Sequence, residues 1–104
     1  PVFPGKQPEE ILQYEFEWWE AIARNTFQQV GVIDQFTDFS AYFSQLYRHF
    51  ATAEPWSIYP DVLQALQYWQ QLDIELGVLS NFDSHLHSVL QALDLAQFFS
   101  SVTI

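Results

Sequence analysis

Apolar residues recur at helical spacing along the first half of the chain, in two separate stretches. The first covers residues 8–30, where apolar positions follow one another at intervals of three and four. Pro8 suits the first turn of a helix, and Gly31 suits the position just after its last turn. The second stretch covers residues 39–50, and Thr37 or Asp38 can cap it. Two amphipathic helices joined by a short connection predict an antiparallel helical hairpin.

The pattern changes after this hairpin. Residues 51–59 contain Pro55 and Trp56 and indicate a linker. Pro60 can open a third helix, whose apolar positions continue as far as Leu72.

A strand is predicted next, because the apolar run within residues 74–80 is short and followed by polar residues. Asp83 or Ser84 can cap a fourth helix, and residues 102–104 indicate a second strand. Strand, helix and strand in this order predict a βαβ-like unit. The predicted fold class is therefore mainly α with a small α/β part.

Composition narrows the range of partners. The chain has 104 residues, 49% of them hydrophobic, which is enough for a core. It contains no Cys, so disulfides and thiolate metal sites are excluded and a cytoplasmic location is expected. The formal charge is −10, and such a surface repels phosphate backbones and anionic lipids. We therefore expect neither nucleic acid nor a membrane as a partner, and no apolar run approaches the roughly 18 residues of a membrane helix.

Ser80 and Asn81 are the candidate functional residues. They directly follow the apolar run Leu76-Gly77-Val78-Leu79, at the point where the predicted strand gives way to a helix. Ligands of open α/β sheets bind at the carboxyl ends of the strands, and a hydroxyl and an amide there can hold a phosphoryl group. The alternative is that both residues only turn the strand into the helix.

The residues around this turn resemble the middle of a haloacid dehalogenase-like hydrolase. The resemblance is carried by Tyr-Pro-Asp at residues 59–61, by the strand and turn, and by Ser-Asn-Phe-Asp at residues 80–83. Ser80 falls on that superfamily's second motif, a strand that ends in Ser or Thr. The Ser-Asn-Phe-Asp run is most similar to the phosphatase-like branch.

This resemblance implies a Rossmann-like core with a helical cap. Residues 1–58 would be a partial helical cap subdomain, and residues 59–104 a partial core unit. Trp18, Trp19 and Trp56 match tryptophans of similar proteins. They are interpreted either as the lining of a substrate pocket under the cap or as ordinary core aromatics.

The family's chemistry implies a Mg²⁺-dependent phosphatase that acts on a small phosphorylated molecule. It uses a nucleophilic Asp, a second Asp two residues later, a Lys and a Mg²⁺-binding acidic pair. None of these motifs is found here: no Asp-x-Asp follows an apolar strand, and Lys6 precedes the second motif. We therefore expect no catalytic residue and no metal ligand in this chain, and Mg²⁺ only in a longer parent protein.

The two ends of the sequence support the same expectation. The chain begins with Pro1, contains no Met and closes on the strand-like residues 101–104, so it is interpreted as a fragment that is inactive in isolation. An incomplete sheet would leave an unpaired strand edge, which predicts self-association. The alternative function is a non-catalytic helical domain that binds another protein.

Asp83, His85 and His87 form the one cluster that could suggest a metal site. Residues two apart do not share a helix face, so a capping Asp and two solvent-facing His are the favoured interpretation.

Overall fold

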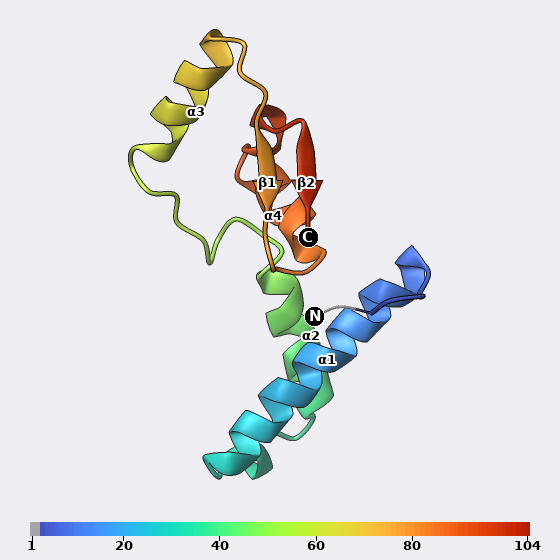
Figure 1. Cartoon of the computed structure of the whole chain (residues 1–104). Helices are drawn as coiled ribbons and strands as arrows, with labels where there is room; N and C mark the ends of the chain where they lie inside the picture. Colours follow the sequence, from blue (N-terminus) through green and yellow to red (C-terminus); the bar gives the residue numbers. More distant parts are fainter. Residues whose placement is uncertain (1–2) are drawn as a thin grey trace. The chain divides into compact units, whose positions relative to one another are not determined.

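The chain folds into helices with one small parallel sheet, as a computed structural model that describes residues 3–104 shows (Figure 1). Helices make up 56% of it, which confirms the predicted fold class. The α-helices are α1 (Pro8–Gln29), α2 (Phe39–His49), α3 (Val62–Gln71) and α4 (His85–Ala92). The strands are β1 (Gly77–Leu79) and β2 (Ser101–Thr103), and the short 3-10 helices are η1 (Ile33–Gln35) and η2 (Ala96–Phe98). Two compact units divide between His49 and Phe50.

The first unit is the predicted pair of helices. Pro8 occupies the first turn of α1, and Asp38 caps α2 by accepting a hydrogen bond of 3.2 Å from the N–H of Ala41. Phe16 of α1 packs with its ring centre 5.4 Å from that of Phe43 of α2, and Phe43 is almost fully buried. Aromatic edge-to-face packing of this kind joins the two helices.

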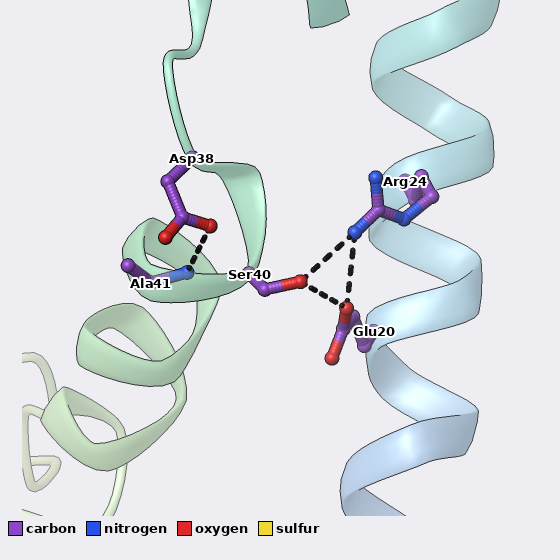
Figure 2. A network of polar contacts seen from close by, with 5 residues as sticks. All are labelled: Glu20, Arg24, Asp38, Ser40 and Ala41. Carbon is purple, nitrogen blue, oxygen red and sulfur yellow. Dashed lines mark hydrogen bonds and ion pairs between the residues drawn. The ribbon is translucent and has the colours of Figure 1, made fainter.

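A polar network joins α1 to the start of α2 (Figure 2). The Arg24 guanidinium donates to Glu20 at 3.1 Å and to the Ser40 hydroxyl at 3.2 Å, and that hydroxyl donates to Glu20 at 3.1 Å. The guanidinium also lies 4.8 Å from the centre of the Phe39 ring. Each of these polar groups has a hydrogen-bonding partner within the network. The pair of helices is therefore held by polar as well as apolar contacts.

The second unit contains the predicted βαβ arrangement. Strands β1 and β2 run parallel in the register Gly77↔Ser101, Val78↔Val102 and Leu79↔Thr103, and α4 lies between them in sequence. A buried apolar cluster holds the unit together. Its members come from α3, α4 and the segment around η2: Leu66, Leu90, Leu95 and Phe98.

Three helices end in the same backbone motif, in which the second residue after the helix adopts a left-handed conformation. That residue is Gly31 after α1 (φ 77°), Asp73 after α3 (φ 57°) and Asp94 after α4 (φ 58°). After α4, the N–H of Leu95 donates to the carbonyl of Leu90 at 2.8 Å, which directs Leu95 into the core. The prediction that Gly31 ends the first helix is confirmed.

The structure differs from the sequence prediction at some boundaries. Helix α3 begins at Val62 and not at Pro60, because residues 59–62 form a turn in which the N–H of Val62 donates to the carbonyl of Tyr59. Strand β1 has three residues where residues 74–80 were predicted, since β2 is an equally short partner. The predicted subdomains, residues 1–58 and 59–104, stay a prediction, and residues 1–2 of the first lie outside the described residues.

Candidate functional site

Ser80 lies directly after β1, as the sequence predicted. Its N–H donates to the carbonyl of Thr103 at 2.9 Å, which continues the ladder between the strands by one residue. Its hydroxyl accepts a hydrogen bond of 3.0 Å from the N–H of Phe82, so Ser80 also closes the turn. Asn81 lies at the exposed tip of this turn. We call residues 80–83 the Ser80 turn.

Asp83 is the last residue of this turn, and its carboxylate is buried. Asp83 is 0% exposed, and its Oδ1 accepts a hydrogen bond of 3.0 Å from the N–H of His85, at the start of α4. The Nδ1 of His85 lies 3.6 Å from the same oxygen. Of the two predicted caps, Ser84 occupies the cap position of α4 without a side-chain hydrogen bond, and Asp83 supplies the side-chain acceptor for the first turn. The expected solvent exposure of His85 is wrong, because this side chain packs against a buried carboxylate and is only 19% exposed. His87 is exposed as expected.

The ring of Trp56 contacts the Ser80 turn from the linker. Its centre lies 5.9 Å from that of Phe82, in an edge-on arrangement with an interplanar angle of 65°. The indole Nε1–H of Trp56 donates to the carbonyl of Phe50 at 2.9 Å, and the rings of these two residues also meet edge-on at 6.1 Å. Sequence reasoning singled out Trp56 but missed its contact with Phe82, because no local pattern links residues 26 positions apart.

Trp18 and Trp19 belong to the first unit. Their rings are nearly perpendicular with centres 4.8 Å apart; Trp18 is exposed and Trp19 half-buried. The lining of one substrate pocket by all three tryptophans stays a prediction. A shallow depression of about 280 Å³ lies beside Arg24 and one of about 220 Å³ beside Asp94, and neither is lined by a residue of the Ser80 turn.

Charge is distributed unevenly along the chain. Lys6, Arg24 and Arg48 all belong to the first unit, whereas the second unit has six acidic residues and no Lys or Arg. Within residues 3–104, no group of three or more His, Cys, Asp or Glu side chains is placed to hold a metal ion. Ser80 and Asn81 therefore offer neutral hydrogen-bonding groups, without a Lys or Arg of their own unit beside them.

The chain combines a pair of helices with a βαβ-like unit whose first strand is followed by Ser-Asn. This combination defines a class of α/β protein that also has a helical part. Comparison with known proteins specifies the family. The sequence model of the haloacid dehalogenase-like hydrolases matches residues 5–104. The chain belongs to this family.

Several relatives carry the same name, haloacid dehalogenase-like hydrolase domain-containing protein 3. The chain is 33% identical to the Xenopus laevis protein over 86 residues, which cover 83% of this chain and 35% of that protein. It is 35% identical to the Danio rerio protein over 86 residues, which cover 82% of this chain and 35% of that protein. The chain thus spans about a third of the length of these relatives. In the part of the chain that the structure describes, no helix is long and apolar enough to cross a membrane.

Proposed function

We propose that this chain is part of a Mg²⁺-dependent phosphatase that hydrolyses a small phosphorylated molecule, and that the Ser80 turn binds the phosphoryl group. The observation that carries the proposal is the position of Ser80 and Asn81 directly after β1. This is the edge where β2, the parallel neighbour, also ends. Ligands of open α/β sheets bind in this position, and the family to which the chain belongs is one of hydrolases.

The Ser80 hydroxyl can hold the turn and a ligand at the same time. A hydroxyl has one donor hydrogen and two acceptor lone pairs, and the N–H of Phe82 uses one of these lone pairs. The hydroxyl hydrogen is then directed by the turn and can donate to a phosphoryl oxygen. Asn81, exposed at the tip, adds the two N–H donors of its amide. Both residues would bind and orient the phosphoryl group.

The described residues do not fit a Mg²⁺ site. The carboxylate nearest to Ser80 in sequence, that of Asp83, is fully buried and accepts a hydrogen bond from His85. Mg²⁺ requires near-octahedral oxygen ligands, normally including a carboxylate, and Ser80 and Asn81 offer only neutral oxygens. No step of the reaction is therefore assigned to a metal held by this chain. Its proposed share is phosphoryl binding, with the nucleophile and metal ligands supplied by the longer protein.

The test replaces Ser80 in the longer protein by Ala and, as a matched control, by Thr. Ser80→Ala removes one donor to the phosphoryl group and should lower the turnover of p-nitrophenyl phosphate with Mg²⁺ on the order of 10²-fold. Ser80→Thr keeps the hydroxyl and should stay within a few-fold of the native rate. The Ala variant also leaves the N–H of Phe82 without its acceptor, which should lower stability by about 1 kcal/mol. A thermal melt run in parallel separates the two effects.

The chain alone should show no phosphatase turnover, because its sequence has no Asp-x-Asp nucleophile motif. A turnover of about one per second or more by the purified chain would contradict the proposed division of roles. A native turnover rate in the Ser80→Ala protein would also contradict the proposal.

A non-catalytic function in protein binding is the second candidate, and exposed apolar side chains of α3 favour it. Leu63 is 44% exposed, Tyr68 59% and Leu72, just after the helix, 54%. Such side chains are typical of a docking face. An inactive longer protein, together with capture of a partner that is lost on Tyr68→Lys, would favour this alternative.

A further inference from the structure

The linker before the core unit is closed into a compact turn around Trp56. The backbone N–H of Trp56 donates to the carbonyl of Ala53 at 3.1 Å, and its indole Nε1–H donates to the carbonyl of Phe50 at 2.9 Å. These two bonds fix the backbone and the ring of Trp56 separately. Phe50 is the first residue of the second unit, so both hydrogen bonds hold Trp56 to the linker that opens this unit.

The same ring also contacts the proposed phosphoryl-binding turn. Trp56 meets Phe82 edge-on, and the N–H of Phe82 donates to the Ser80 hydroxyl. A chain of contacts therefore runs from the carbonyl of Phe50, through the Trp56 indole and the Phe82 ring, to the hydroxyl that would hold the ligand. Aromatic pairs prefer particular mutual orientations, so a change in the Trp56 ring also changes the preferred position of Phe82.

We propose that Trp56 is a positioning residue that couples Phe50, the first residue of the second unit, to the Ser80 turn. In this arrangement, the indole hydrogen bond to Phe50 fixes the orientation of the Trp56 ring. The ring in turn fixes the position of the Phe82 N–H, which orients the Ser80 hydroxyl. A change of the Phe50 backbone that breaks the indole bond would loosen the turn and weaken phosphoryl binding. This inference rests on the proposed function, since it gives the Ser80 turn a ligand, but its structural part can be tested separately.

The first experiment measures amide exchange with solvent by NMR in the chain as it stands. Trp56→Ala should accelerate exchange of the Phe82 N–H about 2- to 10-fold, the range expected for loss of one aromatic pair, and leave the β1 amides unchanged. Trp69→Ala is the matched control, because Trp69 is in the same unit and 41% exposed against 37% for Trp56. It should leave the exchange of Phe82 unchanged.

The indole hydrogen bond is tested by Trp56→Phe, which keeps an aromatic ring and removes only the N–H donor. The carbonyl carbon of Phe50 should shift in this variant as it does in Trp56→Ala, while exchange at Phe82 rises less. A Phe50 signal that stays native in both variants would overturn the link to Phe50. Should Trp56→Ala fail to fold, Phe82→Leu removes the same ring contact from the other side, and faster exchange at residue 82 is again the expected result.

Titration with inorganic phosphate, followed at the amides of Ser80 and Asn81, separates this inference from the proposed function. Native chain should shift with phosphate, and Trp56→Ala should require several-fold more phosphate for the same shift. Faster exchange at Phe82 without any phosphate response in the native chain would uphold the positioning role and overturn the phosphoryl site. A native phosphate response that Trp56→Ala leaves unchanged, with unchanged exchange at Phe82, would overturn the positioning role alone.

Discussion

Asp94 occupies a backbone position that favours glycine, and replacing it should stabilise the protein. It follows α4 with φ 58°, where a β-carbon is disfavoured, and it places a negative charge at the negative end of the helix dipole. Its side chain is exposed, so few contacts are lost on substitution. Gly31 holds the same position after α1 with φ 77°, which shows the residue type that this motif normally takes.

The magnitude follows from two separable effects. The charge next to the last turn of α4 costs about 0.3–1 kcal/mol, which Asp94→Asn removes while keeping a residue that tolerates this conformation. Asp94→Gly also removes the β-carbon, but the greater freedom of glycine in the unfolded chain offsets part of that gain. We expect Asp94→Gly to raise the unfolding free energy by about 0.5–1 kcal/mol, or the melting temperature by about 2–8 °C.

Asp94→Ala is the decisive control. It removes the same charge as Asp94→Gly and differs only by a β-carbon at positive φ, so it should be less stable than the Gly variant by about 1 kcal/mol. Thermal melts followed by circular dichroism at several salt concentrations would measure all three variants, because only the charge effect is screened by salt. An Ala variant as stable as the Gly variant would refute the argument that backbone conformation decides the effect at this position.

Two further perturbations concern the sheet. Gly77→Ala would place a β-carbon 2.6 Å from the Ser101 hydroxyl oxygen and should cost on the order of 1 kcal/mol. In a Ser101→Ala background most of that loss should disappear, whereas additive losses in the double variant would rule out this contact as the cause. Within residues 3–104, β1 pairs with β2 alone, and Leu79 is 85% exposed on this strand. The isolated chain is therefore expected to self-associate through the open edge, and light scattering that finds only a 12.2 kDa monomer at high micromolar concentration would contradict this.

The sequence predicted those features that local physical chemistry decides. Apolar periodicity and end signals identified the helices, and both Asp38 and Gly31 act at the helix ends as expected. The position of Ser80 after a strand was also predictable, because a short apolar run bounded by small polar residues is typical of a buried strand.

Features that depend on distant partners were not predictable. The length of β1 is limited by β2, which lies more than twenty residues later in the chain. The full burial of Asp83 and the contact between Trp56 and Phe82 arise from packing between segments that no local pattern joins. Asp94 was missed for a different reason: glycine is the usual signal for a left-handed residue after a helix, and Asp gives a weaker one.

The placement of every Lys and Arg in the first unit has a practical consequence for biochemistry. Trypsin selects these two residue types through an acidic specificity pocket, and the last of them, Arg48, is exposed at the end of α2. Complete digestion therefore releases residues 49–104 as one uncut peptide, whether or not they are folded. A single protease treatment would deliver β1, α4 and the Ser80 turn together with Trp56, without any change to the gene.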